Sequence, residues 1–549
     1  MRSFKFAGVL LVSILASCST DTSSPTPIRP STADLVAQIS SHCTDLDAPE
    51  LGRGKRCVDN GFRISTDDFS FANWGRSSQA DANVTAQTLI DLFGHESVCM
   101  PGIETQCLLR PTTMQKLEEW NNALSGGRCE GFATLSTRFY LKLDHPADFQ
   151  PGTQRVAQLS QSNASLQQSL VYWWATQFLN EVTDRAATSR SKSPLQLVDE
   201  LIQGLANGVG YTLGLYQNSS GHSVTPFAVT MRDKSFVVHV YDNNFPGKRK
   251  EILVDSVANT WLYKDAVIGI DGQSAQWSGG TGTFELTPMS ARQGPFECSF
   301  CNTTKRKTPI RLSLASRDPK APGFLLITTT DGHTFHTTPQ GITNNIPRLR
   351  YTVGKGSSGS LISVEMPSAV GEFTVRVQRA SSVIPAGDVV VGIQRPGSAS
   401  IQVSGNLAQS VLGAPPQDAD VIRVTSRSTT ISAPRDAKAR VSIAGGSHIS
   451  RIALDAGDTF VVNKISKDAI EVSLKGENGA NKGSTPLSAS SVDTISEVAL
   501  SAENGTLSQT PVGVEPIYVR PRQQRGFTPS VAKQPTTTVP SSIVIALPD

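Results

Sequence analysis

The residue of this sequence with the clearest chemistry is a cysteine that opens an amphipathic segment. Cys129 follows the glycine pair 126–127, and apolar residues recur after it at helical spacing, at Phe132, Leu135, Phe139 and Leu143. This pattern predicts a helix that begins at Cys129. Free backbone N–H groups and the helix dipole favour the thiolate over the thiol at such a position, and the thiolate is the nucleophile.

A thiol nucleophile needs a base, and the base needs a group that orients it. Two strand-like runs, 221–230 and 236–242, flank a polar turn and predict a β-hairpin. If this turn is centred on Asp233, His222 and Asp242 project from one face of the sheet with Cβ atoms about 5 to 8 Å apart. His239 has the opposite parity and points away.

These motifs resemble those of the papain-like and transglutaminase-like cysteine enzymes, in which cysteine heads a helix, histidine begins a strand and an acid or amide ends the next strand. The run 240–247 is also similar to the aspartate-containing strand end of bacteriocin-processing leader peptidases. A group of uncharacterised bacterial secreted proteins shares Gly-Gly-x-Cys-x-Gly-Phe/Met-Ala, Gly-His-x-Val-Thr-Pro and Tyr-Asp-Asn-Asn-x-Pro-Gly. The resemblance spans roughly residues 60 to 265. It implies Cys129 as nucleophile, His222 as general base and acid, and Asp242 as the orienting group.

Papain-like enzymes also place a Gln or Asn side chain a few residues before the cysteine, where it helps to hold the oxyanion. The nearest amides here are Asn121 and Asn122, and Asn73 is a more distant candidate. None of the three matches the position that the family uses. Backbone N–H groups at the helix start, including that of Cys129, are further candidates for the oxyanion hole.

The resemblance implies a cysteine hydrolase of the peptidase or amidase type that acts on a peptide or protein through an acyl-enzyme. If an amine replaces water as the acceptor, the same residues make a transglutaminase-type acyl transferase. The alternative is a non-catalytic binding or adhesion protein that uses the papain-like fold as a scaffold and contacts a cell-surface protein. The residues do not choose between hydrolysis and acyl transfer, but the intact trio of Cys129, His222 and Asp242 in matching order favours an enzyme over the scaffold. We expect neither a cofactor nor a metal.

The N-terminus predicts export. Arg2 and Lys5 precede an apolar run that ends in Leu-Ala-Ser-Cys at 15–18, which is typical of a signal peptide and matches the bacterial lipobox. We therefore expect lipid attachment at Cys18, with an ordinary secretory signal as the alternative. Ser19 favours an outer-membrane or surface location in the cell envelope. The formal net charge of +3 indicates no nucleic-acid partner.

Eight cysteines are consistent with this compartment. Without Cys18 and Cys129 six remain, and such cysteines pair in an oxidising environment. Sequence neighbours suggest Cys43–Cys57, Cys99–Cys107 and Cys298–Cys301, although six cysteines allow fifteen connectivities. For Cys298 and Cys301 a redox or zinc role is the alternative, but neither a second cysteine pair nor a thioredoxin-like pattern accompanies them.

The chain, 549 residues long, has room for about three or four domains. We predict an α+β papain-like domain of helices and antiparallel sheet, followed by all-β sandwich-type, immunoglobulin-like domains. The predicted parts are a signal peptide at 1–17, a flexible tether at 18–32, the papain-like domain at 33–300, a β-sandwich at 305–405, a second β-rich domain at 406–515 and a disordered tail at 516–549.

Three local predictions bear on the structure. Residues 166–182 predict one helix, and residues 251–263 predict one strand. The glycine-rich run 354–359 superficially resembles a phosphate loop. It lacks the Gly-Lys-Ser/Thr ending and a following helix, so we interpret it as a turn.

Overall fold

The structure is a computed structural model. It describes residue 37 and residues 57–75, 83–102, 104–268, 274–301, 309–316, 322–356, 361–379, 387–395, 399–407, 410–411, 422–433, 436–443, 448–466, 469–488, 496–503, 505–512, 517–520 and 522. The predicted signal peptide, tether and lipidated Cys18 lie outside these residues.

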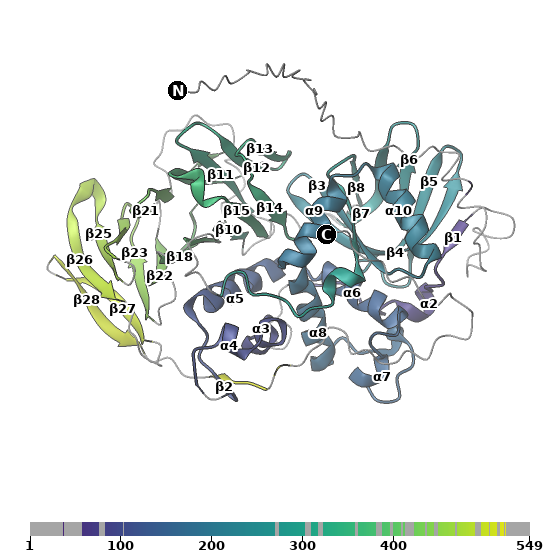
Figure 1. The fold of residues 1–549 in the computed structure, drawn as a ribbon, viewed down its shortest axis with the longest axis horizontal. Helices are drawn as coiled ribbons and strands as arrows, with labels where there is room; N and C mark the ends of the chain where they lie inside the picture. Colours follow the sequence, from purple (N-terminus) through teal and green to yellow (C-terminus); the bar gives the residue numbers. More distant parts are fainter. Residues whose placement is uncertain are drawn as a thin grey trace, which may run out of the picture.

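The first part of the chain combines helices with an antiparallel sheet (Figure 1). The described helices are α2 (Ile64–Asp67), α3 (Ala86–Phe93), α4 (His95–Val98), α5 (Pro111–Ala123), α6 (Cys129–Tyr140), α7 (Pro146–Phe149), α8 (Ala164–Ala175), α9 (Asn180–Arg190) and α10 (Pro194–Ala206). The sheet runs in the order β8-β7-β6-β5-β4-β3-β9, and β1 pairs with β4. Its strands are β1 (Cys57–Asp59), β3 (Tyr211–Gln217), β4 (Ser220–Arg232), β5 (Ser235–Tyr241), β6 (Arg249–Asp255), β7 (Thr260–Ile268), β8 (Ser274–Gly279) and β9 (Phe284–Pro288).

Apolar residues on both faces of this sheet are covered by helices. α10 begins with a capping box at Ser193 and a proline at its first position, and its apolar side packs with Val240 and other strand residues in one hydrophobic cluster. α6 and α8 pack with Tyr241 in a second cluster. Val240 and Tyr241 are consecutive residues of β5 and point to opposite faces of the sheet, so helices cover both of its faces. A Cβ at Gly131 would overlap the Leu170 carbonyl, so glycine permits the close approach of α6 and α8.

Two predicted elements are wrong. The helix predicted at 166–182 stops at Ala175, continues as a short 3₁₀ turn to Phe178 and breaks at Leu179, whose backbone is extended (φ −86°, ψ 145°), before α9 starts. The strand predicted at 251–263 is a hairpin of β6 and β7. The Asp255 carboxylate accepts the N–H groups of Val257 (2.7 Å) and Ala258 (2.8 Å), which closes the turn.

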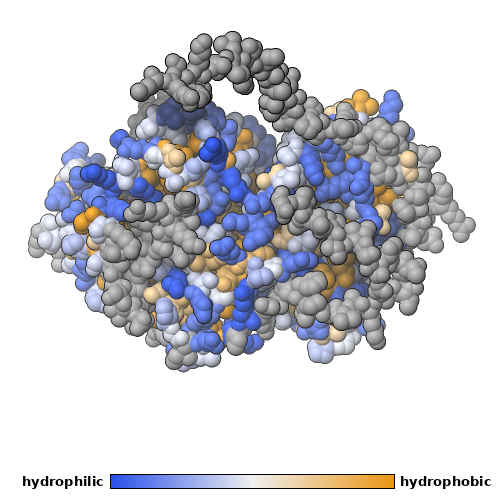
Figure 2. All heavy atoms as spheres, viewed as in Figure 1, coloured by the Kyte–Doolittle hydropathy of each residue, from blue (hydrophilic) through white to orange (hydrophobic). Residues whose placement is uncertain are grey.

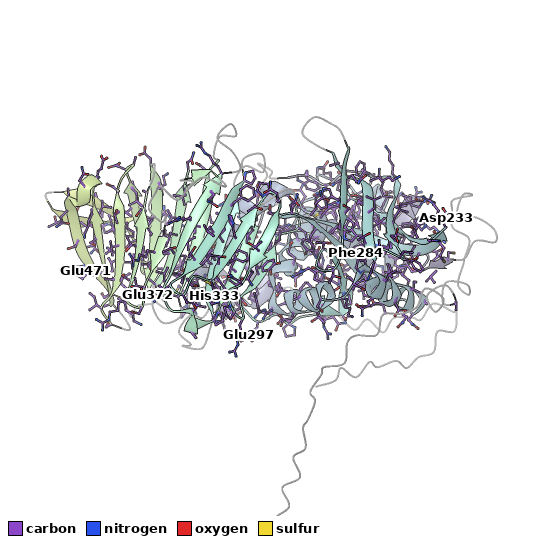
Figure 3. All side chains as sticks on the ribbon, turned by 90° about the horizontal axis from the view of Figure 1, so that it is seen from above. Asp233, Phe284, Glu297, His333, Glu372 and Glu471 are labelled. Carbon is purple, nitrogen blue, oxygen red and sulfur yellow. A yellow bond between two sulfur atoms is a disulfide. The ribbon has the colours of Figure 1, made fainter. Side chains whose placement is uncertain are left out.

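The later part of the chain forms two sheets that face each other around one hydrophobic core (Figures 1 and 3). Seen from above, it lies beside the helical part. One sheet orders β14-β15-β10-β17-β18-β22-β23-β27-β28 and the other β13-β12-β11-β16-β20-β21-β24-β25-β26, with β19 on β16. The predicted combination of helices and antiparallel sheet followed by a β-rich region is confirmed at this coarser level.

The strands of this β-rich part are short. They are β10 (Ile310–Ser316), β11 (Gly323–Thr329), β12 (Thr334–Thr338), β13 (Gly341–Asn344), β14 (Arg350–Val353), β15 (Leu361–Met366), β16 (Phe373–Arg379), β17 (Val389–Gln394), β18 (Ala399–Gly405), β19 (Ser410–Val411), β20 (Ile422–Val424), β21 (Ser428–Ser432), β22 (Ala437–Ile443), β23 (His448–Leu454), β24 (Thr459–Lys464), β25 (Ala469–Lys475), β26 (Asn481–Ser488), β27 (Ser496–Glu503) and β28 (Thr506–Val512). Both sheets and the core take residues from either side of the boundary predicted at 405/406.

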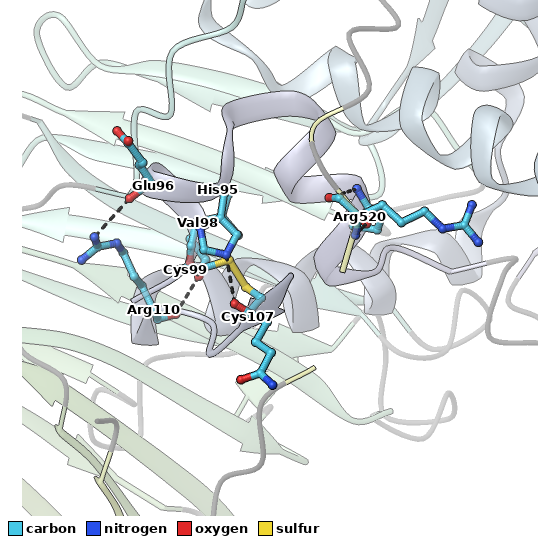
Figure 4. Close-up of a disulfide and its surroundings, with 10 residues drawn as sticks. His95, Glu96, Val98, Cys99, Cys107, Arg110 and Arg520 are labelled. Carbon is cyan, nitrogen blue, oxygen red and sulfur yellow. Dashed lines mark hydrogen bonds between the residues drawn. A yellow bond between two sulfur atoms is a disulfide. The ribbon is translucent and has the colours of Figure 1, made fainter. Parts of the chain in front are cut away.

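After β28 the chain returns to the helical part. β29 (Ile517–Tyr518) pairs with β2 (Gln106–Cys107), and the Arg520 N–H donates to the Gln87 side chain (2.7 Å; Figure 4). The tail that we predict to be disordered from residue 516 is therefore ordered at 517–520. Its backbone donors and acceptors are used by β2, which no local pattern in the tail reveals.

Two of the predicted disulfides are confirmed, Cys99–Cys107 (Figure 4) and Cys298–Cys301. Cys57 is also disulfide-bonded, and its predicted partner Cys43 lies outside the described residues. These bonds indicate an oxidising, extracytoplasmic location. The face in Figure 2 is mostly hydrophilic over its described residues, with hydrophobic residues in small groups. Among the helices that the structure describes, none has the length and apolar character to cross a membrane.

Candidate active site

Cys129 is the first residue of α6, as the sequence predicts. A 3₁₀ turn at Leu124–Gly126 and Gly127 lead the chain into the helix. Gly127 has φ +107°, and a Cβ there would lie 2.8 Å from Asn73 Nδ2, so both the backbone conformation and the close approach favour glycine. Cys129 is the free cysteine of the described residues. Its thiol therefore lies where backbone N–H groups and the helix dipole stabilise negative charge.

The hairpin of β4 and β5 brings His222 and Asp242 together. Thr225 stands opposite Tyr241 in the antiparallel pair, and His222 Nε2 lies 2.9 Å from Asp242 Oδ1. His222 also lies close enough to the Cys129 side chain for that side chain to raise the pKa of the imidazole. The structure thus brings together the three side chains that the sequence singles out, with a hydrogen bond between His222 and Asp242.

Asp242 is held by two further groups. The Tyr263 hydroxyl donates to Oδ2 (2.5 Å), and the Asn244 backbone N–H donates to Oδ1 (2.9 Å). Tyr263 is buried on β7, two strands away from β5 in the sheet. The sequence gives no sign of this contact, because residues 251–263 predict one strand and so conceal the hairpin that turns β7 back toward the site.

Asn243 is a second residue that the sequence analysis missed. Its side-chain amide donates to the backbone carbonyls of Cys129 (3.2 Å) and Ser223 (2.8 Å). It therefore joins the first turn of α6 to the strand residue that follows His222. The sequence does contain a signal for this role. Two asparagines directly follow Asp242 at the end of the strand, and a turn alone does not require both.

Among the three amides proposed from the sequence, Asn73 is the one at the site. Its Oδ1 accepts the Arg128 N–H (2.7 Å), and its Nδ2 lies 3.3 Å from Asn244 Oδ1. Its backbone N–H donates to the Asn243 carbonyl (2.8 Å). Asn73 therefore lies beside the residue that precedes the cysteine, a placement that its sequence distance conceals.

Asn121 and Asn122 are placed differently. The Asn121 side chain accepts from the Val84 N–H (2.7 Å) and donates to the Val84 carbonyl (2.9 Å), so its amide is held by the segment that precedes α3. Asn122 is buried on α5, and its Nδ2 has no hydrogen-bond partner in the described part of the chain. Proximity in sequence was misleading because α5 ends before the turn that delivers Cys129.

The electrostatics of the site favour a charged imidazole. Burial alone lowers the pKa of His222, but the Asp242 carboxylate and the hydrogen bond and charge of Cys129 outweigh it and raise that pKa to about 10. Near neutral pH His222 is therefore protonated. A protonated imidazole next to the sulfur stabilises a thiolate, the reactive form of cysteine.

The site is closed in this structure. Cys129 and Asp242 are fully buried and His222 is 4% exposed. The Arg128 guanidinium donates to the carbonyls of Trp74 (2.8 Å) and Gly75 and lies over the Trp74 ring, which holds this segment against the start of α6. Any acyl transfer to the sulfur requires a movement of the chain around it.

The described residues include no group of three His, Cys, Asp or Glu side chains suited to bind a metal ion. No family model, curated protein or solved structure matches this chain. The chemistry of the site is therefore argued from its own geometry.

Proposed function

We propose that this protein is an extracytoplasmic cysteine hydrolase of the peptidase or amidase type, with a papain-like arrangement of catalytic residues. The observation that carries the proposal is the convergence of Cys129, His222 and Asp242 from three separate elements into one buried site, where His222 is hydrogen-bonded to Asp242 and its pKa is raised by Cys129. Two further hydrogen bonds fix the carboxylate. A histidine that is oriented by a fixed carboxylate and lies beside a cysteine is the arrangement that activates a thiol.

In the proposed reaction the Cys129 thiolate attacks a substrate carbonyl carbon. The Cys129 backbone N–H and the Asn73 amide, which lies beside Arg128, are the candidates to stabilise the oxyanion. Protonated His222 then gives its proton to the leaving amine, the C–N bond breaks and an acyl-enzyme remains. His222, now neutral, takes a proton from water as that water attacks the thioester, and the acid product leaves with the Cys129 thiolate and protonated His222 restored. An amine in place of water makes the same reaction an acyl transfer.

The burial of the sulfur favours one other candidate, a non-catalytic scaffold. Alkylation of the mature protein with iodoacetamide near neutral pH, followed by peptide mapping, distinguishes the two. Rapid modification of Cys129 that is lost in His222→Ala supports the enzyme. The matched control is His239→Ala, which removes another buried histidine that bonds to Thr230 (2.8 Å) instead of to the site. An inert Cys129, or equal loss in both variants, contradicts the proposal.

We further propose that lipid at Cys18 holds the enzyme in the bacterial envelope, with a peptide or protein as substrate. The support is the lipobox in the sequence together with the disulfides. Labelling with a fatty-acid probe in the producing cell tests the anchor. Incorporation that Cys18→Ala abolishes is the expected result, and unlabelled wild-type protein in the soluble fraction contradicts it.

A further inference from the structure

One loop of the β-rich part reaches the candidate active site. It follows β14 and carries the Gly-Lys-Gly run that the sequence analysis interpreted as a turn. The Gly356 N–H donates to the Gly221 carbonyl (2.8 Å), and Gly221 directly precedes His222. The Lys355 N–H donates to the Gln177 side chain (2.6 Å). The backbone of Lys355 and Gly356 is therefore held from two sides by the helical part of the chain.

The side chain of Lys355 lies next to the residue that follows the nucleophile. Its Nζ is 3.0 Å from Glu130 Oε2 and 2.6 Å from Glu285 Oε1, and both carboxylates are fully buried. Lys355 itself is 3% exposed. Gly214 on β3 leaves the space it needs, since a Cβ there would lie 3.0 Å from Lys355 Cε. A glycine on one part of the molecule thus accommodates a lysine from the other.

Two arginines complete this charge cluster. Arg292 pairs with Glu130, and Arg190 pairs with Glu285. Neutral donors also contribute, because the Tyr216 hydroxyl donates to Glu285 (2.9 Å) and the Thr212 hydroxyl to Glu130 (3.2 Å). Burial raises the pKa of Glu130, but Lys355 and Arg292 outweigh it and lower that pKa. Basic neighbours lower the pKa of Glu285 in the same way, so both carboxylates are ionised and face the three basic side chains.

We propose that Lys355 is a positioning residue for Cys129, which makes the β-rich part a component of the active site. It pairs with the carboxylate of Glu130 and keeps the charge at the start of α6 favourable to the thiolate. This proposal rests on the proposed function, because the charge of the Cys129 sulfur affects catalysis only if Cys129 is the nucleophile.

The sign of each charge change follows from Coulomb's law. Removal of the Lys355 cation leaves Glu130 less compensated, so the thiolate forms at higher pH. Removal of the Glu130 anion, with Lys355 still paired to Glu285, makes it form at lower pH. A loss of stability alone does not shift a titration in opposite directions.

The test is a pH titration of the Cys129 thiolate by its ultraviolet absorbance, measured in the full chain as the difference from Cys129→Ser. We expect Lys355→Met to move the midpoint up and Glu130→Gln to move it down, each on the order of half a pH unit. The double variant should lie between them, and Lys355→Arg should keep the wild-type midpoint.

The matched control is Arg440→Met, which breaks another ion pair between the two parts, that of Arg440 with Glu118 (2.8 Å) on α5. It should leave the midpoint unchanged. Unshifted midpoints, or shifts of the same sign, in folded Lys355→Met and Glu130→Gln overturn the proposal. If Lys355→Met does not fold, Glu130→Gln decides alone, and a midpoint that fails to fall is the contrary result.

This titration measures the charge of the sulfur and requires neither substrate nor turnover. An unreactive Cys129 in the alkylation experiment therefore overturns the proposed function and leaves the titration valid. Opposite shifts in a protein without turnover would confirm the electrostatic role of Lys355 alone.

Discussion

Tyr263 donates a 2.5 Å hydrogen bond to Oδ2 of Asp242, on the carboxylate whose other oxygen bonds to His222. The two oxygens therefore have different tasks, since one is anchored to β7 and the other directs the imidazole. This division fixes the plane of the carboxylate while all three side chains remain buried.

Tyr263→Phe should lower kcat/KM about 10-fold and leave the fold intact, because one buried hydrogen bond to a charged group contributes about 1.5 kcal/mol or more. The rate of Cys129 alkylation should fall in parallel. Tyr241→Phe is the matched control, since its hydroxyl accepts a 3.4 Å bond from the Phe69 N–H. Equal rates for wild type and Tyr263→Phe would show that Asp242 needs no anchor.

The raised pKa of His222 predicts how stability depends on pH. Despite burial, Asp242 and Cys129 raise this pKa from the ordinary 6.5 to about 10, so the folded state holds the proton more tightly than the unfolded chain. This contribution is fully present below pH 6.5 and is lost as pH rises through about 10. Denaturant unfolding of wild type and His222→Gln should therefore differ less at pH 10 than at pH 7. A difference that grows with pH contradicts this sign.

The register of the β4–β5 hairpin illustrates how far the sequence reaches. The prediction centres the turn on Asp233, whereas the structure pairs Arg232 with Ser235, which places the turn half a residue later. A bulge between Pro226 and Ala228 restores the predicted register, so that Thr225 faces Tyr241. The predicted register therefore holds at the end of the hairpin where His222 and Asp242 lie, and it places them together. The bulge that restores this register is not predicted from the sequence.

Residues far from the motifs were beyond such reasoning. Asn73 and Tyr263 reach the site through tertiary packing, and no local periodicity records where their segments lie. Lys355 is the extreme case, because the glycine-rich run around it predicts a polar turn, whereas its side chain is buried against carboxylates of the helical part. Sequence patterns predict elements and their faces, whereas contacts between distant elements depend on packing.

The placement of Asn73 predicts that its amide affects catalysis, whereas the amide of Asn121 affects only stability. Asn73→Ala should lower kcat about 10²- to 10³-fold with a small change in KM, as expected for a group that acts on the oxyanion. Asn121→Ala is the matched control, because its amide bonds only to Val84 in the described structure and should affect stability alone. Steady-state kinetics and thermal unfolding of both variants test this, and a kcat reduced equally in the two would assign Asn73 a structural role.

The contact of Arg522 with the end of α3 predicts an effect on the stability of that helix. The Arg522 guanidinium donates to the backbone carbonyls of Asp91 (3.2 Å) and Leu92 (2.6 Å), where the helix leaves acceptors unsatisfied and the dipole favours a cation. Arg522→Ala should lower the local free energy of opening of α3 by about 1 kcal/mol. Arg520→Ala is the control, since its bond to Gln87 uses the backbone N–H and survives the substitution. Hydrogen exchange of the α3 amides measures both variants, and unchanged exchange in Arg522→Ala would show that β29 docks without stabilising the helix.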